Sequence, residues 1–339
     1  MRILSLLTLA TLSLSAVPSA QFLQEFEAYA EGERKVWGVP SMAIAIVSED
    51  KILYEKGFGA RGLDDKRPVT KDTLFQIGSL TKAFTAALVA MGVEERRFEW
   101  TTPVQEVMAD FQLADSWVSR QFQMQDLLAQ RSGLPSYAGD NQSILGFDRE
   151  QIYRHMVHLK PATSFRAEFA YQNVFFLAAA RALEKSDMGG YEALLDERIF
   201  KPLGMTNSSA TLKAYQENEN SAEWSLRRED GTWLNLGRSY PYEEWNYTYG
   251  AAGGINSSVH DMAKWTLFQA NLGTFNGKRL ISEENMRMMH RPFIFAGERN
   301  NLSVYYALGW LHVENSPYPI ICHDGATMGV FKALGVIPQ

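Results

Sequence analysis

Residues 75–82 read Phe75-Gln76-Ile77-Gly78-Ser79-Leu80-Thr81-Lys82, and an apolar run follows them. The pattern predicts a helix with Ser79 in its first turn and Lys82 on the same face. Unpaired N–H groups and the positive dipole end at a helix N-terminus favour a neutral Lys82 and a developing alkoxide on Ser79. An amine with a lowered pKa can remove a hydroxyl proton, so the pair is a candidate nucleophile and base. The alternative is a capping serine beside a solvated lysine.

The spacing of a serine and a lysine is not specific by itself. Ser48-Glu49-Asp50-Lys51 is a second match in the same chain. It spans a predicted hairpin turn, where the two side chains would not converge. The assignment of Ser79 and Lys82 therefore depends on further motifs.

A second motif, Tyr171-Gln172-Asn173, is the only Tyr-x-Asn in the sequence. A turn there would point the two outer side chains the same way. The phenol could relay protons, and the amide could hold a substrate carbonyl or orient Lys82. The alternative is a buried tyrosine at a helix start.

The third motif, His323-Asp324-Gly325, follows an apolar run over residues 318–322. In a strand, His323 and Gly325 lie on one face, and a glycine lets another backbone approach closely. We therefore place a substrate-binding strand here. A structural histidine is the alternative.

The composition excludes some classes of function. The chain has 339 residues, of which 46% are hydrophobic, so it can bury a large core. A net charge of −6 provides no basic surface, so we expect no nucleic-acid partner. The single cysteine allows no intramolecular disulfide.

The N-terminus has the pattern of a signal peptide over residues 1–20. Arg2 precedes an apolar run over residues 3–17, and Pro18-Ser19-Ala20 offers a small-residue cleavage site. The run is shorter than the roughly 20 residues that a membrane-spanning helix needs, which disfavours the alternative of a membrane anchor. No cysteine lies near the site for lipid attachment. We expect a periplasmic or secreted protein with no stable membrane anchor after cleavage.

Residue patterning predicts strands at both ends of the chain and helices between them. This indicates an α/β (α+β) fold with an antiparallel sheet built from both chain ends and an inserted helical lobe. Residues 216–249 are polar and aromatic, and we interpret them as a surface excursion whose Trp224, Trp233, Tyr240 and Trp245 either pack or line an acyl pocket. The expected helices are 22–36, 124–130, 173–184 and 257–271; the expected strands are 41–47, 52–54, 307–313, 318–323 and 331–337.

Four stretches, residues 75–82, 126–135, 201–205 and 252–258, carry a resemblance to a known family. With the three motifs, they resemble the serine β-lactamase and penicillin-binding protein superfamily. The similarity is greatest to its class C-like branch of esterases, D-aminopeptidases and DD-carboxypeptidases. It implies a β-lactamase/transpeptidase-like fold, an antiparallel sheet flanked by helices, and a serine hydrolase that works through an acyl-enzyme.

The resemblance also implies a role for each motif residue. Ser79 would be acylated, and Lys82 and Tyr171 would exchange its proton. No cofactor or metal would be needed. The substrate would contact Asn173, His323, Gly325 and Ala326, with the backbone N–H groups of Ser79 and Ala326 as the oxyanion hole.

The third motif departs from that of most β-lactamases of this fold, which have lysine followed by threonine or serine. His323 offers no permanent positive charge to a β-lactam carboxylate, and Asp324 would repel an anion. Both favour an ester or a D-amino-acid amide or peptide as substrate. A DD-carboxypeptidase or weak class C-type β-lactamase is the alternative. A further alternative is a sensor or pseudoenzyme that is acylated without turnover.

Members of this branch continue beyond the stretch that matches residues 331–338 with a further strand and a C-terminal helix. We therefore expect a truncated chain with a gap in its sheet, where unpaired backbone groups are costly. The expected organisation is a single domain over 21–339. Its α/β lobe would comprise about 21–78 and 250–339, and its helical lobe about 79–249.

Overall fold

The computed structural model describes residues 18–338, which divide into two compact units with their boundary between Gly38 and Val39. The first unit holds helix α1 (Ala20–Val36), as predicted for residues 22–36. Ser19 begins this helix, because its side chain accepts a hydrogen bond from the backbone N–H of Phe22 at 3.1 Å. The apolar run over residues 3–17 lies outside the described residues. None of the described helices has the length and apolar character needed to cross a membrane.

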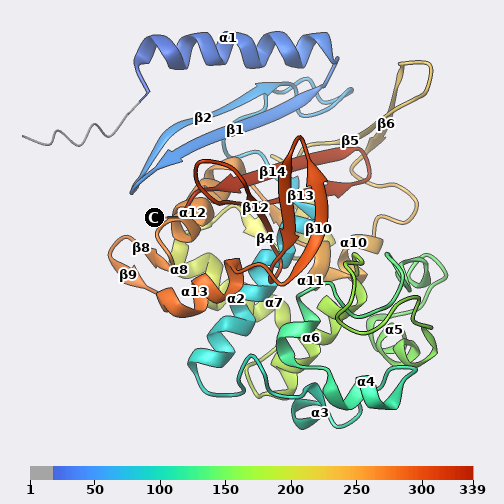
Figure 1. The fold of residues 1–339 in the computed structure, drawn as a ribbon. Helices are drawn as coiled ribbons and strands as arrows, with labels where there is room; N and C mark the ends of the chain where they lie inside the picture. Colours follow the sequence, from blue (N-terminus) through green and yellow to red (C-terminus); the bar gives the residue numbers. More distant parts are fainter. Residues whose placement is uncertain (1–17, 339) are drawn as a thin grey trace, which may run out of the picture. The chain divides into compact units, whose positions relative to one another are not determined.

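The second unit combines helices and antiparallel sheets (Figure 1). Its helices are α2 (Thr81–Glu94), α3 (Val104–Val107), α4 (Ser116–Gln121), α5 (Arg149–His155), α6 (Val174–Lys185), α7 (Tyr191–Leu195), α8 (Lys201–Leu203), α9 (Leu212–Glu217), α10 (Trp245–Thr248), α11 (Gly250–Gly253), α12 (Val259–Ala270) and α13 (Glu283–His290). Its strands are β1 (Ser41–Ser48), β2 (Lys51–Gly59), β3 (Phe75–Gln76), β4 (Ser208–Ser209), β5 (Trp224–Arg227), β6 (Trp233–Gly237), β7 (Asn256–Ser257), β8 (Thr274–Phe275), β9 (Lys278–Arg279), β10 (Ile294–Arg299), β11 (Leu302–Tyr306), β12 (Leu311–Glu314), β13 (Ile320–Thr327) and β14 (Val330–Val336).

The largest sheet has five antiparallel strands in the order β10-β11-β12-β13-β14. The predicted N-terminal hairpin is present as β1 and β2, paired antiparallel. The expected sheet from both chain ends, with a gap in it, is present as two separate sheets: no ladder between described residues joins β1 to β14. Helix α12 instead packs against β1, β2 and β14, so the hairpin and the five-stranded sheet share one covering helix.

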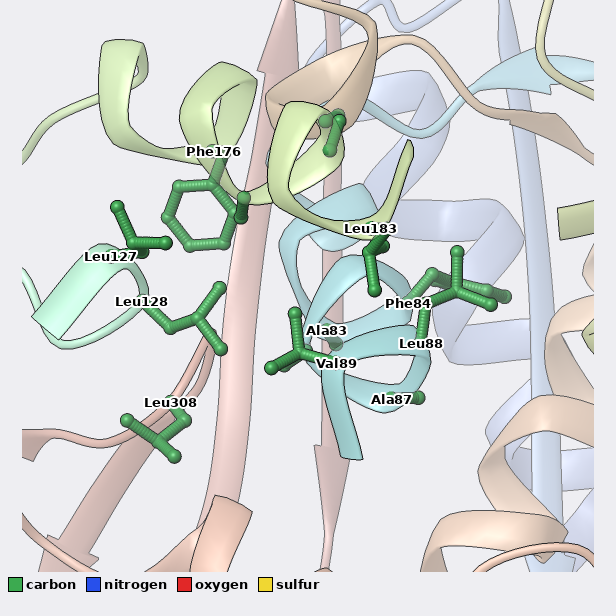
Figure 2. Packing of buried hydrophobic residues seen from close by; sticks show 14 of the residues in the cluster. Ala83, Phe84, Ala87, Leu88, Val89, Leu127, Leu128, Phe176, Leu183 and Leu308 are labelled. Atoms are coloured by element: carbon green, nitrogen blue, oxygen red, sulfur yellow. The ribbon is translucent and has the colours of Figure 1, made fainter. Parts of the chain in front are cut away.

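Helix α2 is the centre of the core. Every residue from Thr81 to Gly92 is buried, as expected for a helix that is apolar all round. Phe84 stacks on Trp265 with ring centroids 3.7 Å apart. Other sides of α2 meet Phe176 and Leu183 of α6, the Leu127-Leu128 segment and Leu308 (Figure 2). The packing fixes the start of α2, and with it the Ser79-Lys82 pair.

Two predicted elements have other boundaries in the structure. The expected strand 307–313 is interrupted, because residues 307–310 form a tight turn and β12 begins only at Leu311. Gly309 has a φ of +75°, and a Cβ there would lie 2.6 Å from the carbonyl oxygen of Lys82. The turn therefore packs directly on the first turn of α2. The expected helix 124–130 is only a short 3₁₀ turn over Met124–Leu127.

The interpretation of residues 216–249 as a surface excursion is wrong in part. They contain the hairpin β5-β6, and Trp224 is fully buried. Its ring stacks on Tyr215 with centroids 5.1 Å apart and meets Tyr240 edge-on at 4.8 Å. These rings, with Leu74, form a second small core. The sequence missed this because a strand of four residues carries little periodicity.

Candidate active site

The nucleophile motif begins in a 3₁₀ turn over Gly78–Leu80, immediately before α2. Two glycines bring strand β13 against this turn. A Cβ on Gly78, whose φ is +55°, would lie 2.8 Å from the carbonyl oxygen of Ala326. A Cβ on Gly325 would lie 2.0 Å from the carbonyl oxygen of Ile77, a distance that no side chain tolerates. The first and third motifs therefore meet through backbone contact, which requires these glycines.

Lys82 is completely buried, and three oxygen atoms surround its amine. Nζ lies 3.1 Å from Ser79 Oγ, 2.7 Å from Asn173 Oδ1 and 3.0 Å from the carbonyl oxygen of Ala252. The carbonyl oxygens of Asn173 and Ala252 can only accept hydrogen bonds. A neutral amine has two N–H groups for them, so its lone pair is left facing the hydroxyl of Ser79.

The charge state of Lys82 suits this arrangement. Burial lowers its pKa to about 7, and the nearby Asp140 carboxylate opposes that shift. The amine is then close to half neutral at neutral pH. A buried lysine with such a pKa can accept the Ser79 proton, whereas a solvated one would stay protonated.

The Tyr171-Gln172-Asn173 motif lies just before α6 and is fixed by hydrogen bonds to residues 130–137. The Gln130 amide clamps the backbone of Gln172, accepting from its N–H at 2.6 Å and donating to its carbonyl at 2.9 Å. The carbonyl of Tyr171 accepts from the N–H of Tyr137 at 2.7 Å. Gln130 and Tyr137 both adopt positive φ, +56° and +61°. Such strained backbone is concentrated at functional sites.

The phenol of Tyr171 lies beside the amine. Lys82 Nζ is 4.7 Å from the centre of the Tyr171 ring. The hydroxyl is buried and has no hydrogen-bond partner among the described residues. Burial raises the pKa of Tyr171 well above its usual range, and the neighbouring Ser79 hydroxyl opposes this only in part. Tyr171 is therefore a neutral phenol that can donate its proton.

His323 is buried and neutral, in the tautomer with its proton on Nδ1. Nδ1 lies 2.6 Å from the carbonyl oxygen of Asp324, which can only accept a hydrogen bond. Nε2 is then an acceptor for the Tyr306 hydroxyl at 3.1 Å. Burial lowers the pKa of His323 to about 3, and the Lys82 charge lowers it further. This position therefore presents no positive charge at neutral pH.

The sequence analysis missed Asp140, which joins the site through Asn173. Its Oδ2 accepts a hydrogen bond from Asn173 Nδ2 at 2.6 Å. Its Oδ1 is buried and has no partner among the described residues. Burial raises the pKa of Asp140 to about 6, against the opposing effects of Asn173 and Lys82. No spacing in the sequence indicates this residue, because it lies 33 positions before Asn173 in an irregular segment.

These residues open into a cleft of about 900 Å³. Five of the seven predicted site residues line it: Ser79, Tyr171, Asn173, His323 and Ala326. Lys82 is buried with its amine 3.1 Å from Ser79 Oγ, and Gly325 lies on β13 against Ile77. Ser79 and Ala326 both reach the cleft, and the oxyanion-hole role of their N–H groups stays a prediction. Eight of the lining side chains are aromatic: Tyr137, Phe169, Tyr171, Tyr240, Tyr242, Trp245, Tyr249 and Tyr306.

The structure divides the four aromatic residues considered for an acyl pocket. Tyr240 and Trp245 line the cleft. Trp224 belongs to the second core, and Trp233 lies on β6 outside the cleft lining. Packing is confirmed for Trp224, and the acyl-pocket role stays a prediction for Tyr240 and Trp245. No cluster of three or more metal-ligating side chains occurs within residues 18–338.

This chain is similar to one known protein family and to several known proteins. The β-lactamase family profile matches residues 26–339. The chain is 27% identical over 318 residues to the Unguisins hydrolase ungD′ of Aspergillus campestris, covering 89% of this chain and 57% of that protein. It is 24% identical over 311 residues to Protein flp of Staphylococcus aureus strain MRSA252, covering 89% and 58%. The chain thus spans less than two thirds of the length of these relatives.

A solved structure shares the fold. The octameric penicillin-binding protein homologue from Pyrococcus abyssi superposes with a TM-score of 0.80 at 23% identity. The match covers 93% of this chain and 71% of that one. The predicted β-lactamase/transpeptidase-like fold is confirmed.

Proposed function

The chain belongs to the β-lactamase family, and we propose that it is an exported serine hydrolase of esters or D-amino-acid amides and peptides. The family and the hydrolase-named relatives support a serine-hydrolase type of function. Ser79 forms the acyl-enzyme in this proposal. One observation carries it: the Lys82 amine, with a pKa of about 7, lies 3.1 Å from Ser79 Oγ and has its N–H groups engaged elsewhere.

Acylation uses the amine as base. Lys82 Nζ takes the proton of Ser79 Oγ while Oγ bonds to the substrate carbonyl carbon. The N–H groups of Ser79 and Ala326 stabilise the developing oxyanion. The carbon–oxygen or carbon–nitrogen bond to the leaving group then breaks. Tyr171 donates its proton to that group and regains one from Lys82.

Deacylation repeats the exchange with water. The attacking water gives a proton to the Lys82–Tyr171 pair, and its oxygen bonds to the acyl carbon. The ester bond to Oγ breaks, and Oγ receives the proton. Asn173 contacts the substrate beside the amine. The step returns Ser79 and Lys82 to their starting forms.

The charges of the cleft favour neutral or cationic substrates over anionic ones. The ring of His323 is neutral. Arg299 lies 3.9 Å from Asp324 on the exposed rim, so the charge of Arg299 is balanced by this carboxylate. The charged side chains that line the cleft are Asp140, Glu298, Arg299 and Asp324. This supports an ester or amide substrate over a β-lactam with its carboxylate. A DD-carboxypeptidase or weak class C-type β-lactamase is the second candidate.

A substrate panel tests the proposal. Short-chain nitrophenyl esters, D-alanyl amides and peptides, and nitrocefin are compared with wild-type protein and Ser79→Ala. We expect Ser79-dependent turnover of an ester or D-amino-acid amide that exceeds nitrocefin hydrolysis. Preferred hydrolysis of nitrocefin would replace the proposal with the β-lactamase alternative.

The panel also separates an enzyme from a sensor that is acylated without turnover. Release of more than one equivalent of nitrophenol per protein supports the enzyme. A burst of one equivalent that then stops supports the sensor. The hydrolase name of the Aspergillus campestris relative favours turnover.

Export rests on the sequence pattern of residues 1–20. We expect the mature protein in the periplasm or medium, with its N-terminus near residue 20. Mass spectrometry of the N-terminal peptide from the exported fraction checks this. Retention of Met1 on protein found only in the cytoplasm would contradict it.

A further inference from the structure

From the contacts of Asp140, we infer that this residue is a positioning residue of the proposed reaction: its carboxylate fixes the orientation of the Asn173 amide and sets the pH at which Lys82 becomes a base. The inference rests on the proposed function. Asp140 is 8% exposed and touches no reacting atom in this arrangement. It acts through Asn173, which lies between it and the amine.

The geometry forces one amide orientation. An ionised carboxylate only accepts hydrogen bonds, so Asp140 Oδ2 selects the NH₂ end of Asn173 at 2.6 Å. The carbonyl end of Asn173 must then face Lys82 Nζ, at 2.7 Å. Rotating the amide would place two donors against each other and an oxygen against the carboxylate. Asn173 thus always offers an acceptor to the amine, which leaves the lone pair of Lys82 directed at Ser79.

Two side chains from residues 245–249 hold the backbone of the turn that carries Asp140. The carbonyl oxygen of Asp140 accepts from Trp245 Nε1 at 2.9 Å. The carbonyl oxygen of Gly139 accepts from the Tyr249 hydroxyl at 2.7 Å. Gly139 has a φ of +86°, which suits this turn. The carboxylate is therefore positioned independently of Asn173.

The charge of Asp140 acts on Lys82 in a direction that can be measured. Among the described residues, the titratable groups that face Asp140 are Lys82 of α2 and the phenols of Tyr171 and Tyr249. Lys82 also faces the neutral ring of His323 on β13. Both phenols have raised pKa values and stay neutral at neutral pH. Asp140, with a pKa of about 6, is mainly ionised at pH 7 and raises the pKa of Lys82. Without that charge, Lys82 would lose its proton at lower pH.

The unpaired oxygen of Asp140 supports a role beyond packing. A buried carboxylate oxygen without a hydrogen-bond partner destabilises the folded state. Oδ1 is such an atom among the described residues. This unfavourable arrangement is explained if the site needs the charge of Asp140 to act on Lys82 without direct contact.

The test is the pH profile of kcat/KM, which reports acylation of the free protein. Wild type, Asp140→Asn and Asp140→Glu are compared on a nitrophenyl ester between pH 5 and pH 9. Glu298→Gln is the matched control, because it removes a negative charge from the same cleft without contacting Asn173. Cooperative thermal melts establish that each variant is folded.

We expect Asp140→Asn to move the acid limb of the profile down by about one pH unit and to lower the plateau. Asp140→Glu, which keeps the charge, should retain the wild-type limb, and so should Glu298→Gln. An unmoved limb in Asp140→Asn, or an equal shift in Glu298→Gln, would overturn the inference. If Asp140→Asn does not fold, Asp140→Ser supplies the neutral variant with the same criterion.

Failure of the inference is distinguishable from failure of the proposed function. If Ser79 is not the nucleophile, Ser79→Ala keeps the wild-type rate. If only the role of Asp140 is wrong, Ser79→Ala is inactive and the limb stays in place without the carboxylate.

Discussion

Two buried carboxylates in this protein have opposite surroundings. Asp126 lies between Arg131 and Arg166, whose Nε atoms donate to its Oδ1 at 2.9 Å and 3.1 Å. Its Oδ2 accepts from Arg166 Nη2 at 2.5 Å and from the N–H of Gln123 at 2.9 Å. Among residues 18–338, Asp140 has a single side-chain donor, Asn173, and its Oδ1 has no hydrogen-bond partner.

The difference separates a structural cluster from a reactive one. Around Asp126, every charge has an adjacent opposite charge. Around Lys82, the amine has oxygen partners but no carboxylate in direct contact, and its pKa falls to about 7. A buried group whose charge is only partly balanced by its neighbours can titrate near neutral pH, and such groups are concentrated at functional sites.

The largest expected effect is on the reactive cluster. Lys82→Ala and Tyr171→Phe should each lower kcat/KM by at least about a hundredfold, as expected for positioned acid–base groups. Steady-state hydrolysis of a nitrophenyl ester measures this. Tyr191→Phe is a matched control, because it removes a buried hydroxyl that lies 2.8 Å from Thr85 Oγ1 and outside the cleft lining. Wild-type rates in Lys82→Ala or Tyr171→Phe would remove that residue from the mechanism.

The structural cluster should respond in stability. Asp126→Asn leaves two arginines without their counter-charge and should lower the free energy of unfolding by about 3 kcal/mol. Denaturant unfolding measures the change. The acid limb of kcat/KM should stay at its wild-type position, since Asp126 does not contact Lys82. A shifted limb with unchanged stability would reverse our assignment of the two clusters.

The pH profile of kcat/KM in the wild-type protein tests whether the cluster around Lys82 is reactive. Lys82 must be neutral to act as a base, and burial lowers its pKa to about 7. Below that pH, kcat/KM should fall tenfold per unit, and above it the rate should level off. A limb near pH 10, where a solvated lysine titrates, would contradict the reactive character of this cluster.

The smallest expected effect is at the third motif. His323→Lys adds a cation where the wild-type ring is neutral, so it should strengthen binding of a carboxylate-bearing β-lactam. The gain should be less than about tenfold, because the buried Lys82 charge repels the new ammonium. Competition against nitrocefin measures this, with His323→Gln as the neutral control. Equal affinities in the two variants would mean that position 323 does not contact the carboxylate.

Much of this site could be predicted because its chemistry is encoded in short motifs. Ser79 and Lys82 are three residues apart, and Gly325 marks the close approach of β13 to residue 77. Asp140 and Tyr306 could not be predicted, because they join the site only through contacts between segments that are distant in the sequence. Periodicity says nothing about such contacts.

The same limit applies to the fold. Long elements such as α6 and α12 were predicted well, since their apolar residues repeat over several turns. The turn at residues 307–310 and the hairpin β5-β6 were not, because each depends on packing against a distant element. Tertiary contacts decide such short segments.

The central claim is that the hydroxyl of Ser79 is the nucleophile. Purified protein is incubated with a fluorophosphonate probe and weighed by intact mass spectrometry, with Ser79→Ala as the control. We predict one adduct per wild-type molecule, on Ser79 by peptide mapping, and none on the variant. A folded wild-type protein that gains no adduct, or that carries it on another residue, would contradict the account.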